Sequence, residues 1–248
     1  VAIAPTTAGG GPTVTRVGGA WRISGAAARV AWGRRVPHAA IVAPAPDGGC
    51  VVALIRAADW TAEPGENVAR EPRDTLTFAG PVAAAARMDM NPFDLRLAGA
   101  AARTQQIAGA LAAIAATTVQ YAQDRVQFGR PIGKFQAVQQ SIATLAGQVA
   151  AARAAADIAA EAVGAPMRAL PIAAGKARAG EAASIGAAIA HQVHGAIGFT
   201  FEHRLHFLTK RLWSWRDEFG NDSSWQKFLG RRLAQSGADA MWPTLTAA

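Results

Sequence analysis

The sequence predicts an α+β protein, with a small β-domain over residues 1–90 and a helical bundle over residues 91–248. Three observations support this. Before Met88, short apolar runs alternate with turns rich in glycine and proline, which is typical of strands. After Met88, apolar residues recur every three or four positions, which is the period of an α-helix. Small residues dominate these later stretches, so helix backbones can approach one another closely.

The β-domain begins with a predicted hairpin. "TVTRVGGAWRIS" (residues 13–24) alternates around Gly18 and Gly19, which is the pattern of a tight two-residue turn. Further strands are predicted at 39–43, 50–55 and 74–78, with "PAPDGG" (44–49) as a turn between the first two. "AGGGPT" (8–13) does not match a phosphate-loop spacing, so we interpret it as a flexible loop.

The helical part begins at Asn91-Pro92, a capping residue followed by proline at the first helical position. Apolar positions then define the faces of three helices: Ile107, Leu111, Ile114, Thr118 and Tyr121; Val138, Ile142, Leu145 and Val149; and Ile185, Ile189 and Val193. We expect the third helix to end at Gly198, a fourth to cover 203–219 and a short fifth to cover about 224–233. The result is an up-and-down bundle.

Composition narrows the class of protein. The 248 residues are 51% hydrophobic and carry a net charge of +8, but the positive charges are dispersed. The densest cluster, near the C-terminus, favours a solvated helical face over a nucleic-acid surface: Lys210, Arg211, Arg216, Arg231 and Arg232. A nucleotide cofactor or coenzyme A would also fit the charge. The single cysteine, Cys50, excludes an intrachain disulfide and fits a reducing cytoplasm.

Targeting signals are not apparent. No apolar run reaches the roughly 18 residues of a membrane span. The start, "VAIAPTTAGGG", lacks the charged and apolar regions of a signal peptide. It also lacks methionine, which is consistent with processing or truncation of the chain.

The linker "YAQDRVQFGRPIGKFQAVQ" (121–139) contains residues that helix packing does not require. Gly129 and Pro131 stop the first helix, and Arg125 at its end has a planar fork that suits a phosphate. The amides of Gln127 and Gln136 could meet hydroxyl groups, while Phe128 and Phe135 offer flat apolar surfaces. Together these side chains favour a nucleotide with a pyrophosphate. The equally open alternative is an interhelical loop in which Arg125 caps carbonyl groups.

This linker resembles the signature of the acyl-CoA dehydrogenase family, Y-x-x-x-R-x-x-F-G-x-x-[IL]-x-x-x-Q. "HQVHGAIGFTFEHRLHFLTKR" (191–211) resembles the family's Q-x-x-G-G-x-G-[FY] segment and the helix after it. "TRVGGAWRISGAAARVAWG" (15–33) resembles its middle β-domain. The resemblance implies a middle β-domain of barrel or sandwich type and a C-terminal four-helix bundle. The family's N-terminal helical domain has no counterpart in this sequence.

The resemblance also implies an FAD site at a subunit interface, where the bundle of one subunit holds the adenine and pyrophosphate end of its neighbour's flavin. The positions that match cofactor-binding positions of the family are Arg125, Gln127, Phe128, Phe135, Gln136, Gln192, Val193, His194, Gly195 and Ala196. Ala196 replaces the family's second glycine, a mild departure in a stretch where close backbone approach favours small residues.

Members of the family desaturate an acyl-CoA thioester with a glutamate base that takes the α-proton. By the resemblance, that glutamate stands at one of two places, which fall here on Phe219 and Gly99. Neither residue can take a proton. Glu218 lies one residue early, and because a helix turns by about 100° per residue we expect it to point elsewhere. An active desaturase that uses Glu218 remains an alternative.

Other departures agree with a missing flavin seat. Arg29 and Ala31 replace the tryptophan and threonine that stack on the family's flavin ring, and "APTTAGGGPT" is a degenerate form of an acidic glycine-rich loop. The pattern resembles the heteromeric α2β2 acyl-CoA dehydrogenases of bacterial steroid side-chain degradation, in which a paralogous subunit carries the base. A basic helical binding module is the alternative outside catalysis.

The remaining chemical candidates are weaker. His191 and His194 are three residues apart, as are His203 and His206, but without an accompanying cysteine cluster or zinc motif we predict no metal site. Arg204, Lys210 and Arg211 could reach a coenzyme A phosphate, although a solvated or intersubunit face explains them equally simply. Trp213, Trp215 and Trp225 are expected to be core or interface residues.

Overall fold

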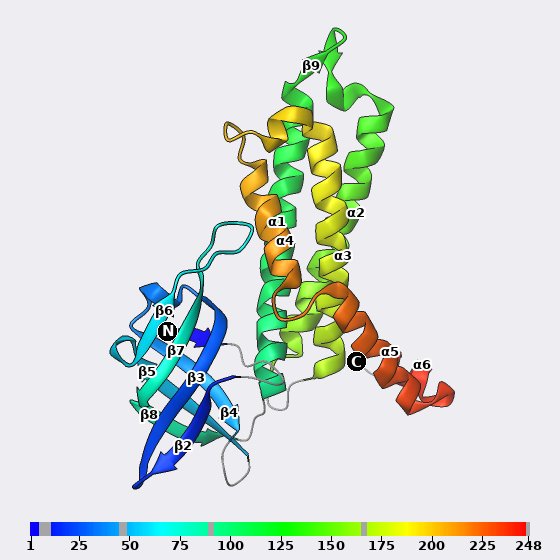
Figure 1. Cartoon of the computed structure of the whole chain (residues 1–248). Helices are drawn as coiled ribbons and strands as arrows, with labels where there is room; N and C mark the ends of the chain where they lie inside the picture. The colour runs from blue at the N-terminus through cyan, green and yellow to red at the C-terminus, as the bar shows by residue number, and fades with distance from the viewer. Residues whose placement is uncertain (5–10, 45–48, 89–91, 165–167, 247–248) are drawn as a thin grey trace. The chain divides into compact units, whose positions relative to one another are not determined.

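The computed structural model describes residues 1–4, 11–44, 49–88, 92–164 and 168–246. The chain divides into two compact units, Val1–Arg96 and Leu97–Ala248 (Figure 1). Asn91, which we expected to cap the first helix, falls outside the described residues, and so do residues 8–10 and 45–48 of the predicted loop and turn segments.

The first unit contains two open four-stranded sheets. One has the order β1 (Ala2–Ala4), β4 (His38–Pro44), β5 (Cys50–Arg56), β8 (Ala84–Met88), in which β1 and β4 are parallel and the other pairs antiparallel. The other has the antiparallel order β2 (Thr13–Val17), β3 (Ala20–Ala31), β7 (Arg73–Pro81), β6 (Trp60–Glu63). Short 3-10 turns occupy Gly33–Arg35 and Ala57–Asp59.

Side chains of both sheets form one core, so the unit is a sandwich and the barrel alternative does not apply. Ile23 and Phe78 of one sheet are buried with Ile41 and Ile55 of the other. The predicted hairpin is confirmed: β2 pairs with β3 through Gly18 and Gly19, which have φ of 57° and 84°. The other three predicted strands correspond to β4, β5 and β7.

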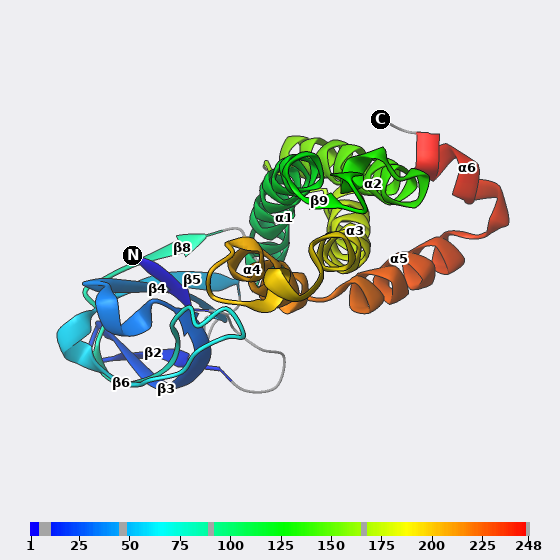
Figure 2. The ribbon, with the colours of Figure 1, turned by 90° about the horizontal axis from the view of Figure 1, so that it is seen from above.

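The second unit is built on four helices that lie side by side: α1 (Pro92–Asp124), α2 (Gln136–Glu161), α3 (Ala169–His194) and α4 (Leu205–Asp217) (Figures 1 and 2). Two further helices follow: α5 (Asp222–Ser236), which packs against α3 and buries Trp225, and α6 (Ala238–Thr246), which comes after it (Figure 2). The expected up-and-down four-helix bundle is therefore confirmed, whereas α6 was not predicted.

The predicted face of α1 lines the core of the bundle, whereas the predicted faces of α2 and α3 are mostly half-buried, and the buried face of α3 is formed mainly by alanine and glycine. Ile107, Leu111, Ile114 and Thr118 of α1 are buried, and so is Leu145 of α2. The predicted end of the third helix was wrong: α3 stops at His194, because Gly195 has a φ of 64°, and a 3-10 helix follows over Gly195–Phe199.

Small residues bring the helices of the bundle together, as the composition predicted. A Cβ added at Gly175 of α3 would lie 2.6 Å from the carbonyl oxygen of Ala155 in α2. A Cβ at Gly186 would lie 2.6 Å from a methyl group of Leu111 in α1. The backbone of α3 therefore lies directly against the backbone of α2 at Gly175 and against a leucine side chain of α1 at Gly186.

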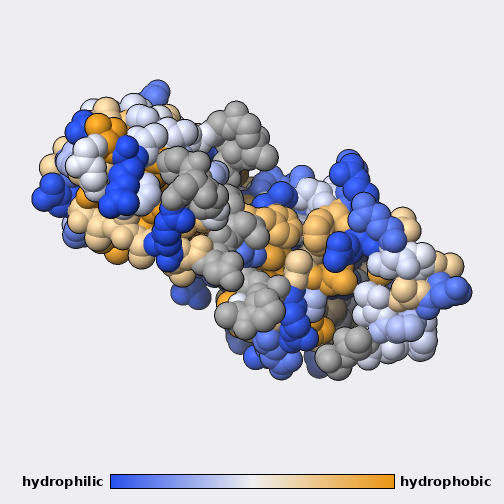
Figure 3. All heavy atoms as spheres, turned by 90° about the horizontal axis from the view of Figure 1, so that it is seen from below, coloured by the Kyte–Doolittle hydropathy of each residue, from blue (hydrophilic) through white to orange (hydrophobic). Residues whose placement is uncertain are grey.

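Two properties of the described residues bear on the class of protein. No helix within them is long and apolar enough to cross a membrane. They also contain no cluster of three or more His, Cys, Asp or Glu side chains with the geometry of a metal site. Figure 3 shows that hydrophilic and hydrophobic residues are interspersed on the face seen from below.

Candidate functional site

The linker between α1 and α2 is a small hairpin at one end of the bundle (Figure 1). β9 (Val126–Gln127) pairs with β10 (Arg130–Pro131), and a 3-10 turn over Ile132–Lys134 leads into α2. Phe128 and Gly129 form the tip with φ of 51° and 78°, which is the geometry of a type I′ turn. The sequence predicted a chain reversal here but not the two short strands.

The left-handed conformation of Phe128 is uncommon for a residue with a side chain. Its ring is 92% exposed and meets the ring of Phe135 edge to face, with centroids 6.2 Å apart. The guanidinium of Arg130 lies 4.3 Å above the centre of the Phe135 ring. The hairpin thus presents aromatic surface and positive charge to solvent, as a nucleotide-binding loop requires.

Arg125 directly follows α1 and is exposed. In the part of the chain that the structure describes, its guanidinium has neither a hydrogen-bond nor an ion-pair partner, and only its backbone is bonded, to Tyr121 and Ile132. Arg125 therefore caps no described carbonyl group, and its planar fork is available to a ligand. Gln127 and Gln136 are also exposed, although Gln127 donates to the carbonyl of Val126.

The second predicted block lies at the same end of the bundle (Figure 1). Tyr121 of α1 joins the two blocks, because its hydroxyl donates to the carbonyl of His194 at 3.2 Å and its ring stacks on the His194 imidazole at 4.4 Å. Gln192, Gly195 and Ala196 are exposed, while Val193 is half-buried and His194 buried. The structure therefore brings both blocks together, with polar and small residues left accessible.

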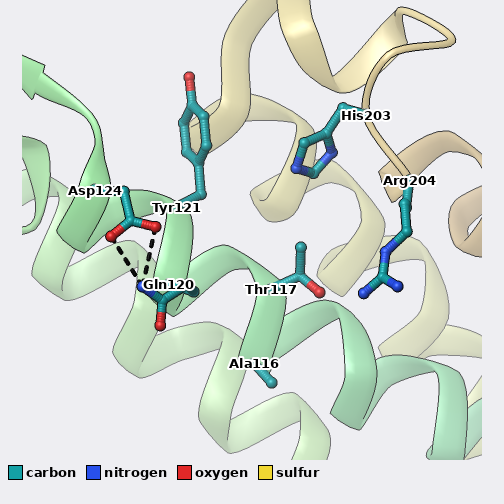
Figure 4. Close-up of a pocket in the computed structure, with 7 residues that line it drawn as sticks. All are labelled: Ala116, Thr117, Gln120, Tyr121, Asp124, His203 and Arg204. Carbon is teal, nitrogen blue, oxygen red and sulfur yellow. Dashed lines mark hydrogen bonds between the residues drawn. The ribbon is translucent and has the colours of Figure 1, made fainter.

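Beside these blocks lies a hollow of about 370 Å³ (Figure 4). α1 and the segment before α4 line it through Ala116, Thr117, Gln120, Tyr121, Asp124, His203 and Arg204. Gln120 donates to both carboxylate oxygens of Asp124, at 2.9 and 3.0 Å (Figure 4). Sequence reasoning considered Arg204 but missed the hollow, since its walls are far apart in the chain.

Four histidines gather near this end of α3. His194 and His203 lie 4.7 Å apart by ring centroids, and His191 Nε2 shares a hydrogen bond of 2.9 Å with Thr209. Burial lowers the pKa of His191 and the pKa of His194. Burial, together with the charge of Arg204, also lowers the pKa of His203. We therefore expect the imidazoles of His191, His194 and His203 to be neutral at pH 7.

This cluster predicts that the bundle loses stability in mild acid. A histidine whose folded pKa lies below its unfolded value contributes stability that is present above the unfolded pKa and is lost as pH falls toward the folded pKa. The free energy of unfolding should therefore fall when the pH is lowered from about 7.5 to 5.5. Urea titrations at both values test this, and the fall should be smaller in the His191→Gln/His194→Gln variant than in the unmodified chain.

A close contact between Gly99 and Phe219 lies toward the other end of α1. A Cβ added at Gly99 would lie 2.2 Å from Cδ1 of Phe219, so the Phe219 ring occupies the space that any side chain at residue 99 would need. The two positions that the sequence analysis singled out for a base therefore meet in space. Gly99 and Arg125 are about 40 Å apart at a rise of about 1.5 Å per residue, so the two features face separate sites.

Glu218, the remaining candidate base, is buried and forms an ion pair with Arg103 of α1. That guanidinium also lies 5.7 Å above the ring of Trp215. The ion pair therefore ties the carboxylate of Glu218 to α1. In the first unit, Arg29 sits at an irregularity of the β3–β7 pairing with a φ of 60°, and its side chain is exposed.

The chain is similar to known proteins over nearly its whole length. Residues 97–234 match the family described as acyl-CoA dehydrogenase, C-terminal domain. A stretch of 96 residues is 49% identical to the acyl-CoA dehydrogenase IpdE2 of Mycobacterium tuberculosis, which is 38% of this chain and 28% of that protein.

Two solved structures share the fold at higher coverage. The ChsE4-ChsE5 complex from Mycobacterium tuberculosis matches with a TM-score of 0.81 and 26% identity, over 95% of this chain and 66% of that one. A variant of the Tcur3481-Tcur3483 steroid ACAD matches with a TM-score of 0.78 and 27% identity, over 94% and 67%. This chain thus spans about two thirds of the length of the chains whose fold it shares.

Proposed function

Because the chain belongs to the acyl-CoA dehydrogenase family, we propose that it is a base-less subunit of a heteromeric, FAD-dependent acyl-CoA dehydrogenase. In this proposal it completes the FAD site of a paralogous catalytic subunit, in an α2β2 assembly. The complex would introduce an α,β double bond into an acyl-CoA of the steroid side-chain class. The observation that carries the proposal is the contact between Phe219 and Gly99.

That contact matters because desaturation requires a base. FAD, when bound, would supply the acceptor for the hydride of the β-carbon, while a carboxylate of the protein would have to remove the α-proton. Both positions at which the family holds that carboxylate are apolar in this chain, and they pack directly against each other. The ring of Phe219 excludes any side chain at residue 99, so neither position can supply the base.

The opposite end of α1 retains what a dinucleotide needs. Arg125 is exposed, with its fork available for a pyrophosphate. The Phe135 ring and the amide of Gln127 belong to the same loop, and Gln136 is the first residue of α2 directly after it, so an adenosine moiety could contact all three. Gly195 and Ala196 allow close backbone approach. These residues fit the phosphate end of FAD, and their distance from Phe219 supports a cofactor seated mainly in another subunit.

The comparisons support the heteromeric assembly and the substrate class. ChsE4-ChsE5 is a complex of two named polypeptides, and Tcur3481-Tcur3483 is described as a steroid ACAD. Each shares more than a quarter of its aligned residues with this chain. We therefore favour a steroid-derived acyl group over a simple fatty acyl group.

The active alternative would use Glu218 as the base. The buried ion pair with Arg103 argues against this, because a base for the α-proton must reach the substrate and exchange its proton there. Family membership likewise argues against a basic helical binding module.

Co-purification tests the proposal. The chain should be purified from its native source and examined by native mass spectrometry, with flavin counted by absorbance. We expect a second, related polypeptide, and flavin only in the complex. A chain that binds flavin and desaturates an acyl-CoA by itself would contradict the proposal. If that activity disappears in the Glu218→Gln variant, the active alternative is correct.

A further inference from the structure

Lys176 is a fully buried lysine in the middle of α3. Its ammonium donates two short hydrogen bonds, to the carbonyl of Arg216 at 2.6 Å and to the carbonyl of Gly220 at 2.8 Å. Arg216 belongs to the last turn of α4, whereas Gly220 precedes α5. One side chain therefore joins the two ends of the segment 216–220, which we call the α4–α5 turn.

The α4–α5 turn has a conformation that needs support. Phe219 has a φ of 57° and Gly220 a φ of 99°, and a left-handed phenylalanine is energetically unfavourable by itself. The end of α4 also leaves carbonyl groups without helical partners. A positive charge at a helix C-terminus stabilises those carbonyl groups, and a lysine can satisfy more than one of them.

Other contacts fix the flanks of the turn. Arg103 of α1 pairs with Glu218, directly before Phe219. Arg216 donates to the hydroxyl of Ser184 on α3 at 3.0 Å. A Cβ at Gly180 would lie 3.2 Å from the Cβ of Asp222, so α3 also passes close to the start of α5. Lys176 contacts the turn on both sides of residue 219, at Arg216 and at Gly220.

We propose that Lys176 is a positioning residue, which holds residue 219 against Gly99 by binding the carbonyl groups on either side of it. The link between residue 219 and catalysis rests on the proposed function, because active relatives are expected to hold the catalytic base at this position. The positioning itself depends on no cofactor. By this inference, the chain retains the support for a catalytic residue although it lacks that residue.

The charge of Lys176 is consistent with this role. Burial lowers its pKa to about 8, against the raising effect of Asp217, Asp222 and Glu218. The side chain is therefore mainly protonated at pH 7, and it keeps all three donor hydrogens. Both bonds to the turn are then charge-assisted, which is the stronger class of hydrogen bond.

A disulfide between residues 99 and 219 measures the position of the turn directly. A Cβ at Gly99 would lie 2.5 Å from Cγ of Phe219, which is one bond from the Cβ of that residue, so cysteines at both positions are within disulfide reach. The double variant Gly99→Cys/Phe219→Cys is made in the whole chain with Cys50→Ala. The rate of oxidation by a copper–phenanthroline catalyst is followed under native conditions.

We expect rapid oxidation when Lys176 is present and a rate lower by about tenfold in Lys176→Met, because two charge-assisted hydrogen bonds are lost. Lys176→Gln, which keeps an amide donor, should give an intermediate rate and serves if Lys176→Met does not fold. Leu145→Ala, a buried truncation in α2, controls for general loss of stability.

Each outcome of the oxidation experiment either supports or refutes the positioning role of Lys176. Equal oxidation rates with and without Lys176 would overturn it, as would a Leu145→Ala control that slows oxidation as much as Lys176→Met. Because no flavin or partner takes part in the measurement, failure of the proposed function would leave this result unchanged. Conversely, a flavin-binding complex with unaltered oxidation in Lys176→Met would refute the positioning role alone.

Discussion

Replacing Arg125 by alanine is expected to strip flavin from the assembled complex. The exposed guanidinium has no described protein partner, so its removal costs the chain little, whereas a bound pyrophosphate would lose a bidentate, charge-assisted contact. Hydrogen bonds to charged groups contribute about 1.5–3 kcal/mol each. The affinity for FAD should therefore fall by about tenfold or more.

The measurement is the ratio of flavin to protein absorbance after exhaustive dialysis of the complex. Arg125→Lys should give an intermediate result, because an ammonium keeps the charge but lacks the planar fork. Arg153→Ala is the matched control, since Arg153 is also an exposed arginine and lies on α2, away from the hairpin. Flavin occupancy that is the same in Arg125→Ala and Arg153→Ala would refute the assigned role of the loop.

What could be predicted from the sequence was local. Ile107, Leu111 and Ile114 recur at helical spacing, and all three are buried on one face of α1. Gly18 and Gly19 indicate a tight turn, and the strands on either side of it pair with each other. In each case the residues that determine the structure are close neighbours in the sequence. Hydrophobic periodicity and turn chemistry are therefore sufficient to predict the element.

What could not be predicted depends on distant partners or on very short elements. Lys176 stands in an alanine-rich helix, where a lysine is normally exposed, and it is buried because carbonyl groups 40 and 44 residues away receive its hydrogen bonds. β9 and β10 have two residues each, too few for an alternating pattern, and phenylalanine is an unusual residue at the first position of their turn.

The candidate site was predictable in part, because some of its residues are close neighbours in the sequence. The residue types of the linker are consistent with a nucleotide, because an arginine, two amides and two aromatic rings occur within twelve positions, from Arg125 to Gln136, but they left a plain interhelical loop equally open. The family resemblance assigned the two positions of the family's base to Gly99 and Phe219. That these residues touch follows only from the way in which the α4–α5 turn folds back onto α1.

Gly175→Ala should be among the most destabilising single-methyl changes in the bundle. Alanine is normally the better helix former by about 1 kcal/mol. Here, however, the added Cβ would lie 2.6 Å from the backbone oxygen of Ala155 and 3.0 Å from the Cβ of Ala159. A backbone atom cannot rotate away as a long side chain can, so α3 must shift from α2. We expect a net loss of about 1–3 kcal/mol in the free energy of unfolding.

Gly109→Ala is the matched comparison, because Gly109 also lies within a long helix but a Cβ there would meet nothing within 4 Å. That change should stabilise the chain by up to about 1 kcal/mol. Urea unfolding of both variants distinguishes packing from helix propensity, since propensity predicts the same sign for both and backbone contact predicts opposite signs. Stabilisation by both changes would show that close contact at glycine does not hold α2 and α3 together. The interpretation that small residues allow these helices to pack closely would then be wrong.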